Sequence, residues 1–165
     1  MEIRLENSGD HESIRNVNDN AFETSSESEI VDKLRSLGEL LLSLVAVVDG
    51  EIVGHIAFSP MNMNGFKTKF VGLGPMAVIR SQQRYGVGSA LVKEGIKNLK
   101  EQGYSAAFVL GHPEYYPRFG FKPSFSNFEI KSKYDVPDNV FMAFELQEGA
   151  LSGVSGLVQY SKAFG

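Results

Sequence analysis

Residues 83–88 read Gln83-Arg84-Tyr85-Gly86-Val87-Gly88, and this stretch decides the fold of the chain. It follows an apolar run, Phe70 to Val78, that predicts a strand, and it leads into an amphipathic segment, Gly86 to Gln102, that predicts a helix. A glycine loop that opens a helix presents several unpaired backbone N–H groups at one point. Such a point binds phosphate, so the first inference is a ligand that carries phosphate.

Three phosphate-loop patterns compete for this stretch. A dinucleotide fingerprint needs G-x-G-x-x-G, but the third glycine position is occupied by Leu91. A Walker loop needs G-x-x-x-x-G-K-[ST], which is absent. The remaining pattern is Gln/Arg-x-x-Gly-x-Gly/Ala at the start of a helix, which is the pyrophosphate loop of coenzyme A-binding proteins.

Two further motifs flank the loop. Met76-Ala77-Val78 ends a strand a few residues before it, and Tyr116-Pro117-Arg118-Phe119-Gly120-Phe121 contains Tyr-x-x-x-Gly-Phe. With them, the chain resembles the GNAT superfamily of N-acetyltransferases over nearly its whole length. Leu110-Gly111-His112-Pro113 with Tyr115-Tyr116 also looks like one bacterial branch of that superfamily, whose members are mostly of unassigned substrate.

The resemblance implies an α/β (α+β) fold with a mixed, mostly antiparallel central sheet and helices on both faces. It also implies a splay between the fourth and fifth strands, where the pantetheine arm lies as a pseudo-strand. Gly74-Pro75 supports this, because a proline inside a central strand donates no ladder hydrogen bond and predicts a bulge.

Local patterns predict the remaining elements. Asp10 can cap a first helix, and Ser26 with Glu29 has the spacing of a capping box for a second helix, whose apolar stripe would be Ile30, Leu34 and Leu37. The other expected elements are a strand at 1–6, a hairpin of 42–48 and 51–59 around Asp49-Gly50, a polar loop at 62–68, a buried strand at 106–110, a short helix from Pro113, and strands near 125–130 and 140–146.

The resemblance implies acetyl-CoA as cosubstrate. Gly86 and Gly88 let the backbone approach the pyrophosphate. Arg84 either adds a charge contact to a phosphate or stays in solvent. The expected cofactor-binding residues are Met76, Ala77, Val78, Gln83, Arg84, Tyr85, Gly86, Val87, Gly88 and Ser89.

The expected chemistry is attack of a primary amine on the thioester. A backbone N–H near Met76 could hold the oxyanion. Tyr116 sits where the family commonly places a tyrosine acid, and its alternative role is a core aromatic. His112 or Glu114 could help the amine lose its proton, whereas His55 is expected to be structural.

Composition excludes several function classes. The 165 residues contain no cysteine, which removes disulfides, thiol nucleophiles and cysteine-ligated metals, and no metal site is expected. The net charge of −4 does not suggest nucleic-acid binding. The N-terminus shows no signal peptide, and the longest apolar run, near Leu40 to Val48, is too short to span a bilayer. We expect a cytoplasmic protein with no membrane partner.

The expected organisation is one acyl-CoA N-acyltransferase domain, 1–165, with the tail 149–165 packed back on the body. That apolar tail could also pair with a second chain as a homodimer. The acceptor would be a small-molecule or peptide amine, and Glu23, Glu27 and Glu29 either attract it or form a solvated acidic face. Two alternatives stay open: a non-catalytic acyl-CoA sensor or scaffold, and an acyltransferase that uses a longer acyl-CoA.

Overall fold

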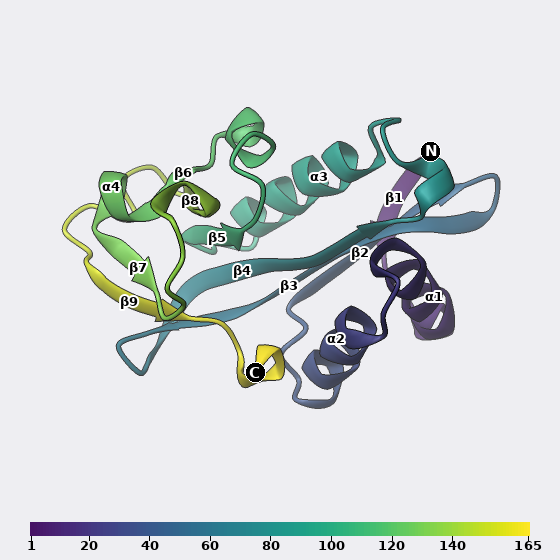
Figure 1. Ribbon diagram of the computed structural model, residues 1–165, viewed down its shortest axis with the longest axis horizontal. Coiled ribbons are helices and arrows are strands. Elements are labelled where there is room, and N and C mark those ends of the chain that lie inside the picture. The colour runs from purple at the N-terminus through teal and green to yellow at the C-terminus, as the bar shows by residue number, and fades with distance from the viewer.

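The computed structural model describes residues 1–165, and one nine-stranded sheet runs through it (Figure 1). Its main path is β1-β2-β3-β4-β5-β8-β6, with β9 pairing β3 and β7. Only β4–β5 and β7–β9 pair in parallel. The strands are β1 Glu2–Leu5, β2 Leu42–Val48, β3 Glu51–Met63, β4 Phe66–Val78, β5 Ala106–Leu110, β6 Lys122–Pro123, β7 Ile130–Ser132, β8 Phe141–Glu145 and β9 Gly156–Gln159.

Helices cover both faces of this sheet. Helix α3 lies on one face, while α1 and α2 lie on the other (Figure 1). The bounds are α1 His11–Phe22, α2 Ser26–Ser36, α3 Val87–Glu101 and α4 Ser124–Phe128, with short 3-10 helices at Ser8–Asp10, Arg80–Gln82, Tyr116–Phe119, Asp138–Val140 and Lys162–Phe164. The predicted fold class, a mixed and mostly antiparallel sheet with helices on both faces, is therefore confirmed.

The largest core cluster lies between α3 and the sheet. Leu91, Val92 and Leu99 of α3 are completely buried, and Phe58 of β3 is buried opposite them. A Cβ at Gly95 would lie 2.6 Å from the Phe58 ring, so this glycine lets helix and sheet approach closely. The helix predicted from the amphipathic run 86–102 is therefore confirmed, and its packing on the sheet fixes the position of its first turn.

Two strands are longer than the sequence analysis predicted. The hairpin at Asp49-Gly50 forms as expected. The residues predicted as a polar loop, 62–68, instead form the end of β3, a two-residue turn and the start of β4. The turn is Asn64-Gly65, and both residues have positive φ, 50° and 84°. Asn-Gly favours this tight hairpin turn, so the error was a missed turn signal.

The segment predicted as a strand near 125–130 is mostly helical. Residues Ser124–Phe128 form α4, and only Ile130–Ser132 forms a strand. The Asp138 carboxylate accepts hydrogen bonds from the backbone N–H groups of Phe125 (3.0 Å) and Ser126 (3.3 Å). A cap supplied from more than ten residues away satisfies the first turn of the helix and outweighs the local strand preference.

The helix starts also differ in detail from the predictions. Asp10 precedes α1 but accepts from the N–H of Asn7 (2.7 Å) and pairs with Arg4 instead of capping the helix. The Ser26 capping box does not form, because Ser26 is the first helical residue and the Glu29 N–H donates to the Ser25 carbonyl at 2.9 Å.

Two further predictions on helices need correction. Val31 and Leu34 form the buried stripe of α2, whereas Leu37 is 40% exposed. The short helix expected from Pro113 begins at Tyr116, and Pro117 lies in its first turn.

The C-terminal segment packs on the body of the protein. Strand β9 pairs with β3 through Asn62 and Gln159. The Ser161 hydroxyl donates to Glu39 at 2.7 Å, and Ala163 is buried. The last residues therefore lie close to α2 and, through Tyr160, to Gly72 and Leu73 in the middle of β4.

A buried polar chain crosses the sheet at His55. The Ser43 hydroxyl donates to the Glu6 carboxylate, so its oxygen accepts from His55 Nε2 at 2.8 Å. Asn18 Nδ2 donates to His55 Nδ1 at 3.4 Å. Burial lowers the pKa of His55 to about 4, which keeps the imidazole neutral. The expected structural role of His55 agrees with this geometry.

The buried hydrogen bonds of His55 predict that the free energy of unfolding depends on pH. In the unfolded state His55 binds a proton below its usual pKa of 6.5, but in the folded state only below about 4. The unfolded state therefore binds more protons in that window, and the free energy of unfolding falls by about 2 kcal/mol between about pH 7.5 and pH 5.

Urea denaturation of wild type and His55→Gln at the two pH values measures this contribution. Glu6 also contributes: burial opposes its charge, but hydrogen bonds from Arg35 and Ser43 outweigh burial and lower its pKa, so acidification protonates this carboxylate in the unfolded state before the folded state. That term is common to both proteins, so the variant should lose less stability than wild type. Equal losses in both proteins would contradict the role given to His55.

Candidate active site

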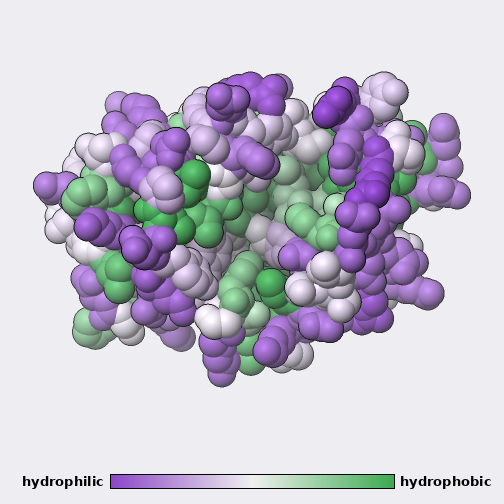
Figure 2. Space-filling view, viewed as in Figure 1, coloured by the Kyte–Doolittle hydropathy of each residue, from purple (hydrophilic) through white to green (hydrophobic).

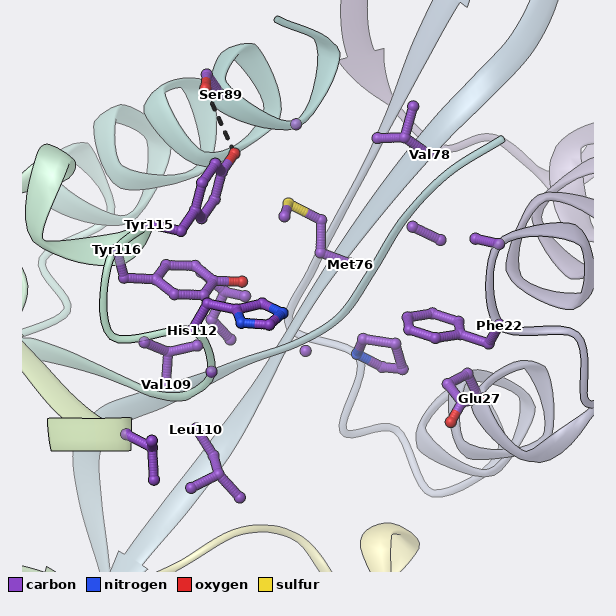
Figure 3. A pocket seen from close by; sticks show the side chains of 18 of the residues that line it. Phe22, Glu27, Met76, Val78, Ser89, Val109, Leu110, His112, Tyr115 and Tyr116 are labelled. Atoms are coloured by element: carbon purple, nitrogen blue, oxygen red, sulfur yellow. Dashed lines mark hydrogen bonds between the residues drawn. The ribbon is translucent and has the colours of Figure 1, made fainter. Parts of the chain in front are cut away.

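A cleft opens where β4 and β5 stop pairing. The two strands pair in parallel from Phe70 with Ala106 to Leu73 with Val109. Beyond Leu73, β4 continues to Val78 paired with β3 but no longer with β5. The cleft has a volume of about 1370 Å³ and is lined by both diverging strands (Figure 3). The predicted splay between the fourth and fifth strands is therefore confirmed. The volume exceeds the roughly 300–1,000 Å³ that suits one drug-sized ligand, so the cleft has room for two substrates.

The divergence begins at a bulge in β4. Met76 lies opposite Ile56 and Leu73 lies opposite Phe58, so Gly74 and Pro75 both face the single residue Ala57. This confirms the bulge predicted at Gly74-Pro75. Because Pro75 has no N–H, its place in the bulge costs no ladder hydrogen bond.

Beyond the bulge, β4 turns backbone groups toward the cleft. The N–H of Ile79 donates to the Val53 carbonyl at 2.9 Å, and hydrogen-bonded pairs alternate along an antiparallel ladder. Met76 and Val78 are the intervening residues, so their N–H and C=O groups point away from β3. Gln83 Nε2 already donates to the Val78 carbonyl at 2.9 Å. An extended ligand lying in the cleft would meet the remaining groups as a neighbouring strand would.

The glycine loop holds a second set of free donors at one end of the cleft. Gly86 has φ of 86° and precedes α3, and the first helical hydrogen bond runs from Ala90 N–H to the Gly86 carbonyl at 3.0 Å. The N–H groups of Val87, Gly88 and Ser89 therefore have no acceptor inside the protein. Together with the helix dipole, these free donors make this end of the cleft chemically suited to an anion.

The segment just before the glycine loop is bonded to α1 and to the residue that follows it. The N–H of Arg80 donates to Asn20 Oδ1 at 2.9 Å, and the Arg80 guanidinium pairs with Glu23. Arg84 lines the cleft with φ of 69° and is exposed to solvent. Tyr85 is 77% exposed and does not line the cleft.

Tyr115, which received no role in the sequence analysis, lies next to the loop. Its hydroxyl is 3.4 Å from Ser89 Oγ (Figure 3), and a Cβ at Gly88 would lie 3.0 Å from it. The Arg118 guanidinium stacks on its ring at 4.5 Å. Tyr115 therefore joins the short 3-10 helix to the glycine loop, and it places a second cation close to that loop. Only the three-dimensional contact reveals this position.

Tyr116 is held rigidly with its hydroxyl toward the cleft (Figure 3). Its ring packs edge-on against Tyr115 and Phe121. A Cβ at Gly111 would lie 2.4 Å from its Cε2, so only glycine fits beside it. Burial, with a smaller contribution from Tyr115, raises the pKa of Tyr116. The phenol is therefore neutral at physiological pH and can donate a hydrogen bond into the cleft.

The structure brings most of the expected site residues together. His112 lines the cleft and is exposed, whereas Glu114 is exposed and does not line it. The expected residues that share the cleft wall are Met76, Ala77, Val78, Gln83, Arg84, Gly86, Val87, Gly88, Ser89, His112 and Tyr116.

The opposite wall comes from segments that the sequence analysis barely used. Phe22 and Glu27, from α1 and α2, lie across the cleft from Tyr115 and Tyr116 (Figure 3). Hydrophobic residues gather around the hollow in the middle of this face (Figure 2). The cleft is further lined by Ala21, Ile30, Tyr134, Val136, Val140, Tyr160 and Phe164.

No three His, Asp or Glu side chains lie close enough together to hold a metal ion. None of the helices combines the length and the apolar character that crossing a lipid bilayer requires.

Comparison with known proteins agrees with this geometry. Residues 2–124 match the acetyltransferase (GNAT) domain family. The chain is 36% identical to the uncharacterized N-acetyltransferase YhbS of Escherichia coli strain K12, over 99% of this chain and 98% of that protein.

Two solved structures share the fold at the same identity. The crystal structure of YhbS from Escherichia coli in complex with CoA superposes with a TM-score of 0.94, at 36% identity, covering 99% of this chain and 91% of that one. A GNAT family acetyltransferase from Brucella melitensis in complex with acetyl-CoA gives a TM-score of 0.85 at 36% identity, covering 99% and 97%. With the splayed sheet and the glycine loop already established, these matches show that the chain belongs to the GNAT family of acetyltransferases.

Proposed function

We propose that this protein transfers the acetyl group of acetyl-CoA to a primary amine in the cleft between β4 and β5. The observation that carries the proposal is the alignment of two sets of free backbone groups along one cleft. The N–H groups of Val87 to Ser89 suit a pyrophosphate, and the edge of β4 at Met76 and Val78 suits an extended amide chain. Relatives at 36% identity that were solved with CoA and with acetyl-CoA support the same cosubstrate.

In this proposal the loop binds the diphosphate and the strand edge binds the pantetheine. Gly86 and Gly88 leave space for the phosphates, and Arg84 and Arg118 supply positive charge beside them. The N–H of Met76 faces the thioester oxygen and stabilises the oxyanion. Residues 1–165 act together as one acyl-transfer domain.

The reaction we propose is direct. The amine nitrogen attacks the thioester carbon, the C–S bond breaks, and the amide and free CoA leave. His112, on the cleft wall, accepts the proton that the amine must lose. Tyr116 donates a hydrogen bond to the sulfur as its negative charge develops. Because burial raises the pKa of Tyr116, the phenol is protonated at physiological pH and can donate this hydrogen bond.

The location of the protein and its oligomeric state are two further points of the proposal. The absence of cysteine fits a cytoplasmic location. The fold offers little apolar tail surface for a homodimer contact, because Val158 and Ala163 are buried within the same chain.

A thiol-release assay with acetyl-CoA and a panel of primary amines tests the proposed function. We expect release of CoA that depends on the amine, together with an acetylated amine detected by mass spectrometry. A non-catalytic acyl-CoA sensor would bind acetyl-CoA in calorimetry and release no thiol with any amine. An acyltransferase for longer chains would turn over butyryl-CoA faster than acetyl-CoA. Either of these results would overturn the proposal.

A further inference from the structure

The cleft outside the glycine loop has a largely apolar lining. Three segments that are distant in the sequence build it: the α1–α2 region, the segment between β7 and β8, and the tail after β9. Phe22 is 40% exposed although it lines the cleft. Apolar surface left open inside a concave site favours an apolar ligand. The side chains concerned are Phe22, Ile30, Val136, Val140, Tyr160 and Phe164.

Charge along the cleft is unevenly distributed. Arg84 and Arg118 lie toward the glycine loop, as their positions and the Arg118–Tyr115 stack show. Glu27 is the only carboxylate on the cleft wall, and it lies on the apolar side, across from Tyr116 (Figure 3). Glu27 forms no ion pair, and its partner is the Thr24 hydroxyl, which donates at 3.1 Å. The cleft therefore carries positive charge near the glycine loop, where a polyanion would bind. Its one negative charge, the Glu27 carboxylate, forms no ion pair.

We infer that the acceptor is a small primary amine on an apolar body, aromatic or branched aliphatic, and that Glu27 attracts its ammonium group. This inference rests on the proposed function. The apolar body packs among Phe22, Val136 and Phe164. The ammonium enters beside Glu27 before it gives up its proton and attacks the thioester. An ion pair in a partly enclosed, apolar setting is stronger than one in open solvent.

Other acceptor classes fit this wall less well. A polyamine carries several charges and needs several acids, but Glu27 is alone. An extended peptide needs an open channel, and the tail narrows the cleft. Tyr160 donates to the Leu73 carbonyl at 3.5 Å, where β4 and β5 diverge, and Ser161 binds Glu39. These contacts hold the tail against the acceptor side, so the pocket suits a compact molecule.

An amine panel tests this inference with acetyl-CoA at a fixed, saturating concentration. The apolar probes are 2-phenylethylamine and isoamylamine, and the polar probes are ethanolamine, putrescine and a glycine-initiated tripeptide. We expect kcat/KM for the apolar probes to exceed that for each polar probe by at least about tenfold, because burying several methylene groups contributes that much binding.

Two matched pairs of variants test the residues. Glu27→Gln keeps the size of the side chain and removes its charge, so KM for 2-phenylethylamine should rise about tenfold, with KM for acetyl-CoA unchanged. Glu12→Gln, an exposed acid on α1, is the control and should change neither constant. Phe22→Ala should likewise raise the amine KM, whereas Phe66→Ala, a 76% exposed phenylalanine at the β3–β4 turn, should not.

The outcomes separate the inference from the function on which it rests. If polar amines are acetylated as well as apolar ones, or if Glu27→Gln behaves like Glu12→Gln, the inference is wrong and the proposed acetyl transfer stands. If acetyl-CoA binds but no amine of either class is acetylated, both fail. A preference for the apolar probes that depends on Glu27 and Phe22 supports the inference.

Discussion

Replacement of Tyr116 by phenylalanine is expected to lower kcat by about 10²–10³-fold, the range that one preorganised hydrogen-bond donor to a developing negative charge contributes. The substitution removes one oxygen and leaves the ring in its packed position against Phe121 and beside Gly111. The affinity for acetyl-CoA should stay within about twofold, because the phenol acts on the sulfur only as the C–S bond breaks. Single-turnover measurement of thiol release isolates this step from product release.

Tyr104→Phe is the control for this variant, because Tyr104 lies in the turn after α3 and does not line the cleft. It should leave the single-turnover rate unchanged. If Tyr116→Phe also leaves that rate unchanged, the tyrosine is a packing residue and the leaving thiolate is stabilised by another group.

Gly88→Val is expected to weaken acetyl-CoA binding by about 100-fold or more, which corresponds to the loss of one or two charge-assisted hydrogen bonds. A Cβ at this position would already lie 3.0 Å from the Tyr115 hydroxyl, and the two methyl groups of valine would occupy space in front of the free N–H groups. The phosphate oxygens could no longer reach those donors. Calorimetric titration with acetyl-CoA measures the change.

A second glycine variant controls for general damage. Gly9 does not have positive φ and does not line the cleft, and a Cβ there would meet only Asn7 Oδ1, at 3.4 Å, so Gly9→Ala is a matched control. It should bind acetyl-CoA as wild type does. Both variants should unfold at temperatures close to wild type. Normal binding by Gly88→Val would show that the phosphates do not lie at this loop.

Features with short-range sequence signals could be predicted from the sequence. Gly86 and Gly88 before an amphipathic run identified the loop, Asp49-Gly50 identified a hairpin, and Gly74-Pro75 identified the bulge. In each case the backbone conformation follows from the residues themselves: Gly86 and Gly50 adopt positive φ, and Pro75 has no N–H. The family resemblance then supplied the order of strands and the splay.

Features that depend on distant contacts could not be predicted in the same way. Helix α4 begins where it does because Asp138 caps it, and Tyr115 lies at the loop because the 3-10 helix folds against α3. The cleft lining combines Phe22 and Glu27 with Tyr160, which lies more than one hundred residues further along the chain. Nothing in the local pattern of these residues indicates that they share a cleft.

Amide hydrogen exchange, followed residue by residue with and without saturating acetyl-CoA, tests the central claim most directly. The N–H groups of Val87, Gly88 and Ser89 have no protein acceptor, and that of Met76 faces the cleft, so all four should exchange quickly in the free protein. Acetyl-CoA should slow exchange at these four positions together, while the distant Asn64-Gly65 turn stays unchanged. If acetyl-CoA binds but these amides keep their free rates, or if protection appears only away from the β4–β5 cleft, the account of the site is wrong.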